Sequence, residues 1–346
     1  MPWPHTAPTR SLPTRLLAPV LACALLLAAC SDDSGESTAT TTAPDAESTT
    51  TSTAPAAEST TTSTAPAAES TTSAPATEAT TPTVPAGLPA DAPTRVVVLP
   101  GDRVYPEGVA FDATTGRYFV SSSEDGTVFS ASLPDDAATE FLAAGGDGRT
   151  NALGMAVDED RRRLWIAGGA SQTVFAYDVD TGELLAAHPV PDADAGSLVN
   201  DITVTDDGDA FATNSGTSQI YRIDGSDDAV GALEVWLDPA GPIIPTDGPI
   251  GHNGIVTTGT GYLLTVDTLT QRLFRIDIET KEIVEVDTGG VGVGLDGLAL
   301  DGTMLLGVTP ASVVTTELAE DYATGSVIGS TTDESFTFAT TVALIP

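Results

Sequence analysis

The chain has 346 residues, of which 13 are Lys or Arg and 49 are Asp or Glu, so its formal net charge at pH 7 is −36. A chain this acidic repels nucleic acid, and we therefore expect no nucleic-acid partner. Its two cysteines, Cys23 and Cys30, both lie near the N-terminus, so the rest of the chain has no disulfide available for its stability.

Residues 1–29 are typical of an export signal. Arg10 and Arg15 precede the apolar run LLAPVLACALLLAAC, which ends at Cys30 and is too short for an ordinary membrane span. The letters LAAC resemble the lipobox of bacterial lipoproteins, which implies cleavage before Cys30 and a lipid on its sulfur. That lipid would anchor the protein in the cell membrane, on the extracytoplasmic face. An ordinary secretory signal, cut nearby, is the alternative.

Residues 30–93 have a different composition, dominated by Ser, Thr, Ala and Pro. The string ESTTTSTAPAA occurs at 47–57 and again at 58–68. A segment of this composition has too few apolar residues to bury a core. We therefore predict a disordered tether between the membrane and a folded domain that occupies residues 94–346.

The domain at 94–346 is built from repeats that begin about every 45 residues. Each repeat contains four short apolar runs separated by polar turns, as in the pair Tyr118–Val120 and Leu164–Ala167, and none has helical periodicity. Four strands in a repeat of this length are typical of a β-propeller blade. The sequence therefore predicts an all-β propeller. The repeats start at Glu107, Leu153, Asn200, Asn253 and Asp296.

The number of blades is harder to infer from the sequence than the repeat itself. Five repeats have clear starts, and the C-terminal string FTFATTVALIP resembles the first strand of a sixth. The string TRVVVLPG, residues 94–101, suits the outer strand of that last blade, because propellers often close their ring with a strand from the other terminus. We therefore expect six blades, the last of them incomplete.

The repeat-start positions carry the candidate chemistry. The first strand of each blade lines the axis of a propeller, so Glu107, Asn200, Asn253 and Asp296 should direct side-chain oxygens toward one another. Carboxylates at close range repel unless a proton or a cation intervenes. This donor set favours a hard divalent ion, Ca²⁺ first, with Mg²⁺, Mn²⁺ or Zn²⁺ as alternatives. The competing interpretation is that these residues only cap the strand entries through Asx turns.

The strings PEGVAFDATTGRYFVSS, NDITVTDDGDAFAT, HNGIV and DGLALDG resemble the senescence marker protein, gluconolactonase and luciferin-regenerating enzyme superfamily. The resemblance implies a six-bladed propeller with one axial cation bound by Glu107, Asn253 and Asp296. It also implies that Asn200 holds substrate or water beside the ion, and that Asp296 serves as general base. His252 adjoins Asn253, and we expect it at the channel mouth as a substrate-binding or proton-relay residue, or else in a loop role.

The resemblance implies a metal-dependent hydrolase of lactones or related esters. One position departs from the family pattern: sugar lactonases often carry an arginine two residues before the Asn200 position, and this chain has Leu198. Leucine cannot bind a polyol, so the substrate is more apolar or the protein is not a catalyst. The alternative is a non-catalytic surface propeller that binds a ligand or partner, with a structural metal or none. We expect a monomer, and we expect the charged turn Arg161–Arg163 to be solvated.

Overall fold

The computed structural model describes residues 96–191, 196–226, 229–238, 251–294, 296–334 and 336–345. All of them belong to one of the two compact units of the chain. The predicted export signal with Cys30, and the predicted tether, lie outside the described residues. No helix within the described ranges is long and apolar enough to cross a membrane.

The described residues form strands and no α-helix, with one 3₁₀ turn at Gly146–Gly148. This confirms the all-β prediction. The strands are β1 (Pro106–Asp112), β2 (Arg117–Ser122), β3 (Val128–Ser132), β4 (Thr139–Leu142), β5 (Met155–Asp158), β6 (Arg163–Ala167), β7 (Thr173–Asp178), β8 (Leu184–Pro189), β9 (Val199–Val204), β10 (Ala210–Asn214), β11 (Ile220–Ile223), β12 (Leu233–Leu237), β13 (His252–Thr257), β14 (Tyr262–Asp267), β15 (Leu273–Asp277), β16 (Ile283–Glu285), β17 (Leu298–Asp301), β18 (Met304–Thr309), β19 (Ser312–Leu318) and β20 (Gly325–Thr331).

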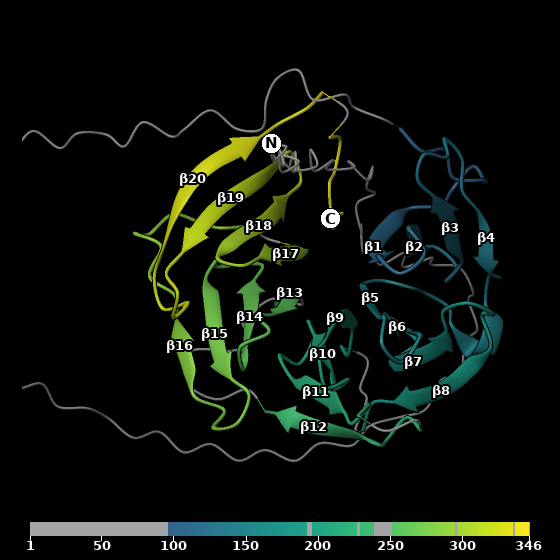
Figure 1. Ribbon diagram of the computed structural model, residues 1–346, viewed down its shortest axis with the longest axis horizontal. Helices are drawn as coiled ribbons and strands as arrows, with labels where there is room; N and C mark the ends of the chain where they lie inside the picture. Colours follow the sequence, from purple (N-terminus) through teal and green to yellow (C-terminus); the bar gives the residue numbers. More distant parts are fainter. Residues whose placement is uncertain are drawn as a thin grey trace, which may run out of the picture. The chain divides into compact units, whose positions relative to one another are not determined.

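Each group of four consecutive strands pairs antiparallel in chain order and makes one sheet, so the strands form five blades. We number these blades 1 to 5 along the chain. Figure 1 shows the blades around a common axis, with β1, β5, β9, β13 and β17 innermost. Successive inner strands pack against one another, β1 on β5, β5 on β9, β9 on β13 and β13 on β17.

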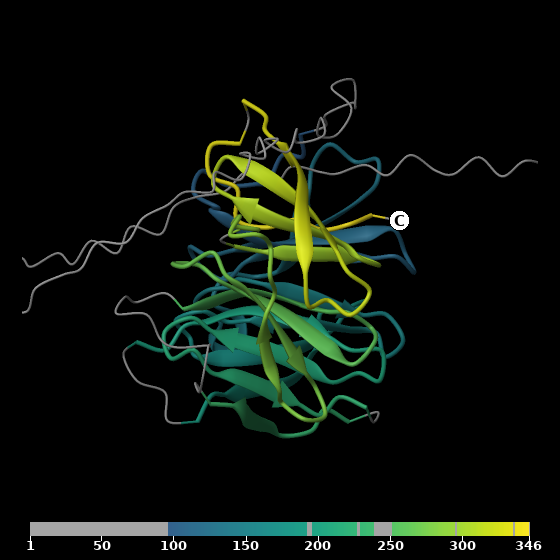
Figure 2. The ribbon, with the colours of Figure 1, turned by 90° about the vertical axis from the view of Figure 1, so that its left-hand side faces the viewer.

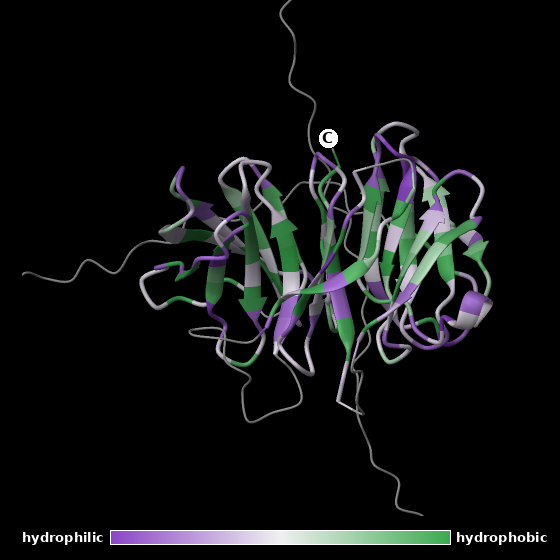
Figure 3. Ribbon diagram, turned by 90° about the horizontal axis from the view of Figure 1, so that it is seen from below, coloured by the Kyte–Doolittle hydropathy of each residue, from purple (hydrophilic) through white to green (hydrophobic). Residues whose placement is uncertain are grey.

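The apolar core lies between neighbouring blades rather than inside any one of them. Phe119 of blade 1 packs in one cluster with Leu164 and Phe175 of blade 2, and Phe211 of blade 3 packs with Phe274 of blade 4. Figure 3 shows the consequence, with hydrophobic colouring concentrated along the strands and polar colouring in the turns. Each blade therefore depends on its neighbours for the burial of its two faces.

The expectation of six blades is wrong, because the described residues form five four-stranded sheets. The string FTFATTVALIP does not add a strand to any of these sheets. We call residues 336–345 the C-terminal segment. This segment instead packs on the face of blade 5 that is turned away from blade 4, and it approaches blade 1. Figures 1 and 2 both show the end of the chain between these two blades. An alternating apolar pattern predicts burial on one side, but it cannot show whether a pairing partner exists.

The expected outer strand of the last blade is also wrong. The backbone of Val98 pairs in parallel with Ala137, beside β4 of blade 1. Val97 and Leu99 pack on the blade 1 cluster that contains Val120 and Phe129, so this stretch covers the free face of blade 1. The N-terminal edge of the domain therefore seals its own blade and contributes no strand to the C-terminal one.

The three arginines at 161–163 are not merely solvated, as we expected, but link neighbouring blades. Arg163 is buried and donates to the Gly225 carbonyl of blade 3 at 2.6 Å. Arg162 donates to both carboxylate oxygens of Asp112 in blade 1, at 2.9 and 2.8 Å. A run of like charges in a turn thus connects blade 2 to both of its neighbours.

Candidate functional site on the propeller axis

The entries of the inner strands form a closely packed ring. A Cβ added to Gly154 of blade 2 would lie 2.0 Å from Oδ1 of Asp201 in blade 3, so only glycine fits at that position. The backbone N–H of Gly154 donates to the Asn200 carbonyl at 2.8 Å. The repeat-start residues are therefore held beside their neighbours around the axis, as the repeat pattern predicts.

Three carboxylates from different blades influence one another on this axis. Burial, followed by repulsion from Asp296 and Asp201, raises the pKa of Glu107 well above its usual value. Burial and repulsion from Asp201 raise the pKa of Asp296 to about 8. Burial raises the pKa of Asp201 to about 6, against the opposing effect of two accepted backbone hydrogen bonds. Blades 1, 3 and 5 thus bring negative charge into one shared, poorly hydrated region.

The two candidate asparagines are buried within the same ring. The Asn253 side chain hydrogen-bonds Asp296, which lowers the pKa of that carboxyl and partly offsets its burial. Nδ2 of Asn200 donates to Ser215 Oγ at 2.7 Å, and Ser215 Oγ donates to the His252 carbonyl at 2.6 Å. Asn200 therefore keeps its amide oxygen as an acceptor, and its orientation is set by blades 3 and 4 together.

Asp201 is the residue that sequence reasoning missed, because it directly follows a repeat start and was not among the candidate residues. Its Oδ2 accepts from the N–H of Ile255 in blade 4 at 2.9 Å, and its Oδ1 accepts from the N–H of Ile202 at 2.9 Å. Its own N–H donates to Thr213 Oγ1 at 3.0 Å. A signal was present, because the matching position of every other repeat is glycine, and an acidic residue there breaks the pattern.

The His252 side chain is buried, with 1% of its surface exposed, and its ring packs edge-on against Phe274 with 6.5 Å between centroids. Neither ring nitrogen has a hydrogen-bond partner among the described residues. Burial lowers the pKa of His252 to about 4, so the ring is neutral at pH 7. The histidine that we expected at the channel mouth therefore lies against Phe274 on an interior face of blade 4.

An axial cavity of about 380 Å³ adjoins the ring. Its wall consists of the inner strands of all five blades together with the C-terminal segment, and Asp201 is its acidic member. Most of the lining residues are aliphatic by type, but polar atoms make up most of the surface that they expose to the cavity. The lining includes Val109, Met155, Asp201, Ile255, Leu298 and Val342.

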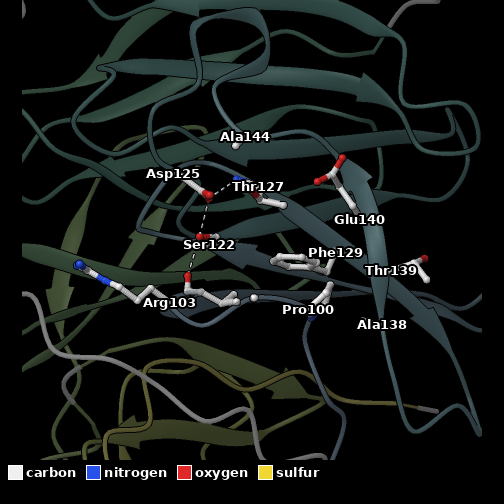
Figure 4. A pocket seen from close by; sticks show the side chains of 12 residues that line it. Pro100, Arg103, Ser122, Asp125, Thr127, Phe129, Ala138, Thr139, Glu140 and Ala144 are labelled. Atoms are coloured by element: carbon white, nitrogen blue, oxygen red, sulfur yellow. Dashed lines mark hydrogen bonds between the residues drawn. The ribbon is translucent and has the colours of Figure 1, made fainter.

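A second cavity, of about 570 Å³, lies on blade 1 away from the axis (Figure 4). Phe129 lies at its centre, and the Asp125 carboxylate accepts hydrogen bonds from Ser122 Oγ and Thr127 N–H. No repeat-start residue lines either cavity, but Asp201, which follows Asn200, lines the axial one. Because the Asp125 carboxylate is already paired within the chain, we place the candidate chemistry on the axis.

No group of three or more His, Cys, Asp or Glu side chains among the described residues is arranged to hold a metal ion. The set implied by the family resemblance is different in kind, because Glu107 and Asp296 supply two carboxylates and Asn253 supplies an amide. Oxygen donors of this type suit Ca²⁺ and Mg²⁺. The raised pKa values of Glu107 and Asp296 mean that their ionised forms are poorly stabilised by the surroundings. A nearby positive charge would stabilise the ionised carboxylates.

Comparison with known proteins supports the fold only. No family model and no curated protein matches the chain. A solved chain of the nidogen/laminin complex is similar at a TM-score of 0.50 and 14% identity, over 70% of this chain and 85% of that one. Virginiamycin B lyase from Staphylococcus aureus, as an inactive variant with quinupristin, gives 0.49 and 15%, over 64% and 69%. The Swd1 β-propeller domain from Myceliophteria thermophila gives 0.48 and 17%, over 67% and 74%. The five four-stranded sheets around one axis themselves identify the fold as a β-propeller.

Proposed function

We propose that this protein is an exported, lipid-anchored propeller that binds a divalent cation on its axis and hydrolyses lactones or related esters. The observation that carries the proposal is the effect of Asp296 of blade 5 on the pKa of Glu107 of blade 1, with Asn253 of blade 4 hydrogen-bonded to Asp296. Three residues far apart in sequence thereby share one poorly hydrated region. The motif resemblance assigns a cation to these same three residues.

The residues of the chain fit the proton transfers of ester hydrolysis. A bound divalent cation would polarise the ester carbonyl. The charge of such a cation would lower the raised pKa of Asp296, and the ionised Asp296 carboxylate could then accept the proton of the attacking water. As the acyl C–O bond breaks, the same proton can pass to the departing alkoxide oxygen. The free amide oxygen of Asn200 can accept a hydrogen bond from substrate or water and orient it.

Leu198 defines the class of ester. Its N–H donates to Asn214 Oδ1 at 3.0 Å and its carbonyl accepts from the Ser215 N–H at 2.9 Å, so its backbone is fixed beside Asn200. A half-buried leucine offers apolar contact where sugar lactonases often carry an arginine. Leu198 therefore favours a lactone or ester with an apolar substituent over a sugar lactone.

The same leucine favours a second candidate, a non-catalytic propeller that binds an apolar ligand. To distinguish the two, purified protein is analysed for bound metal and assayed on lactones with alkyl chains of increasing length, with and without EDTA. We expect hydrolysis that EDTA abolishes and Ca²⁺ restores, and a loss of about 100-fold or more in kcat/KM for Asp296→Asn. The exposed Asp206→Asn is the matched control. Bound cation without turnover supports the second candidate, and failure to bind any divalent ion contradicts both the metal site and the metal-dependent activity.

The lipid anchor has its own test. The sequence around Cys30 supports it, and that segment lies outside the described residues. Expressed with an alkyne-labelled fatty acid, the protein should incorporate the label in its membrane fraction, and Cys30→Ser should abolish incorporation. Cys23→Ser is the control and should leave the label in place. Equal labelling of both variants would contradict the assignment of Cys30.

A further inference from the structure

We propose that the C-terminal segment, residues 336–345, forms the sixth wall of the axial channel, and that Thr340 is a positioning residue for Glu107. The wall itself is a matter of fold. The consequence for cation binding rests on the proposed function, since Glu107 is a proposed ligand of the cation.

Thr340 occupies a ring position like that of a repeat start. The N–H of Gly154 in blade 2 donates to the carbonyl of Asn200, the start of the next repeat, at 2.8 Å. The N–H of Gly297 in blade 5 donates to the carbonyl of Thr340 at the same distance of 2.8 Å. Thr340 therefore stands to blade 5 as Asn200 stands to blade 2, although it belongs to none of the five sheets.

The packing around Gly297 confirms how closely the segment fits. A Cβ at Gly297 would lie 2.6 Å from Thr341 Oγ1 and 2.8 Å from Thr341 Cα, so no larger residue fits there. On the face of blade 5 that is turned away from blade 4, Ala339 and Val342 are buried against Leu306 and Val308. Residues 341–344 also line the axial cavity. The segment is thus part of the channel wall along much of its length.

Thr340 also connects the wall to blade 1. Its side chain is buried, and its Oγ1 donates to the carbonyl oxygen of Glu107 at 3.0 Å. The N–H of the same peptide unit is held as well, because the Gly108 N–H donates to Ser121 Oγ at 2.6 Å. Both polar groups of the peptide unit after Glu107 are therefore fixed, one of them by the C-terminal segment. This fixes the direction in which the Glu107 side chain leaves the backbone.

The consequence is that Thr340 touches no substrate and acts through Glu107. Without its hydroxyl, the Glu107 carbonyl loses its link to the segment, and the carboxylate is no longer held near Asp296. The expected result is weaker binding of the cation and faster amide exchange around Glu107, whether or not a cation is present.

The test compares Thr340→Val with Thr340→Ser in the full chain. Thr316→Val is the matched control, because the Thr316 hydroxyl is buried in blade 5 and has no hydrogen-bond partner in the part of the chain that the structure describes. Ca²⁺ is titrated calorimetrically, and hydrogen exchange is followed over residues 106–110. We expect Thr340→Val to weaken Ca²⁺ binding by about five- to tenfold and to speed exchange at 106–110, as loss of one buried hydrogen bond implies. Thr340→Ser and Thr316→Val should behave as the wild type.

The outcomes separate this inference from the proposed function. If the wild type binds Ca²⁺ and Thr340→Val binds it equally well, the positioning role is overturned and the proposed function stands. If the wild type binds no Ca²⁺, the Ca²⁺ site fails, and exchange at 106–110 alone decides whether Thr340 orders the Glu107 backbone. Equal exchange in wild type and Thr340→Val overturns the inference in either case.

Discussion

Two junctions of the ring are built in different ways. Between blades 3 and 4, the Asp201 carboxylate accepts the Ile255 N–H, Thr213 donates to the Asn253 carbonyl, and Ser215 donates to the His252 carbonyl. Phe211 and Phe274 add the apolar core of that junction. Between blades 5 and 1, the contact runs through a single unpaired segment and the Thr340 hydroxyl. The ring is therefore redundantly held at one junction and thinly held at the other.

Of the changes that test this difference between the junctions, removal of residues 334–346 should have the largest effect on stability. It uncovers the face of blade 5 that Ala339 and Val342 cover, and it deletes the link between Thr340 and Glu107. We expect a loss of about 5 kcal/mol or more in the free energy of unfolding, from urea denaturation. Deletion of the tether repeat 47–57 is the control and should cost nothing. A truncated chain as stable as the wild type would mean that the segment does not close the ring.

Gly154→Ala should have the next largest effect on stability, because it disturbs Asp201, which links blades 3 and 4. Its Cβ would lie 2.0 Å from the Asp201 carboxylate, which must then move away from the Ile255 N–H. We expect a loss of about 2–4 kcal/mol in the free energy of unfolding. Gly146→Ala is the control, since the nearest atom to a Cβ there lies 3.8 Å away. Equal effects of the two substitutions would contradict the close contact.

The pH dependence tests the shared charge on the axis. Burial raises the pKa of Asp201 to about 6, and burial together with repulsion from Asp201 raises that of Asp296 to about 8. A raised pKa means that the folded protein holds protons more tightly than the unfolded chain, so this stability is lost as pH rises through both values. In EDTA, the melting temperature should fall between pH 5 and pH 9, by the equivalent of roughly 1–3 kcal/mol.

Two further arms make the pH experiment decisive. Asp296→Asn should reduce the fall, because a neutral amide has no proton to lose, and added Ca²⁺ should reduce it in the wild type. The exposed Asp206→Asn should leave it unchanged. If wild type and Asp296→Asn decline in parallel, the axial carboxylate does not titrate as its surroundings imply.

Arg162→Lys should have the smallest effect, at the junction between blades 1 and 2. The guanidinium donates to both oxygens of Asp112 and, at 3.1 and 2.7 Å, to both oxygens of Asp180, which a single ammonium cannot reproduce. We expect a loss of about 1 kcal/mol in the free energy of unfolding. Arg103→Lys, at an exposed pair with Glu124, is the control. A larger loss for the control would show that the bidentate contact is unimportant.

The repeat made the blades predictable from sequence. The predicted strands Tyr118–Val120 and Leu164–Ala167 lie within β2 and β6, because alternation and turn residues are local signals that survive in the fold. Closure of the ring was not predictable in the same way. FTFATTVALIP and TRVVVLPG both have strand-like composition, and only tertiary pairing decides which sheet, if any, they join.

The candidate site, too, contains residues that local sequence patterns can predict and residues that only tertiary contacts determine. Register in the repeat places Glu107, Asn200, Asn253 and Asp296 at matched strand entries, which a local pattern can predict, and their sharing of one cation stays a prediction. The role of Asp201 depends on the Ile255 N–H, 54 residues away, and no local pattern encodes it. His252 was misjudged because a strand entry can direct its side chain between blades as readily as toward the channel.

The hydrogen bond between Thr340 and Glu107 spans 233 positions of the chain. Contacts between such distant residues carry a large loop-closure entropy, so they tend to form late during folding, after each local hairpin has zipped up. We therefore expect a folding intermediate with five ordered blades to lack the completed axial ring. In this protein, competence to capture a cation would emerge only with the final tertiary step, and the rate of that step would limit how soon a newly made molecule becomes functional.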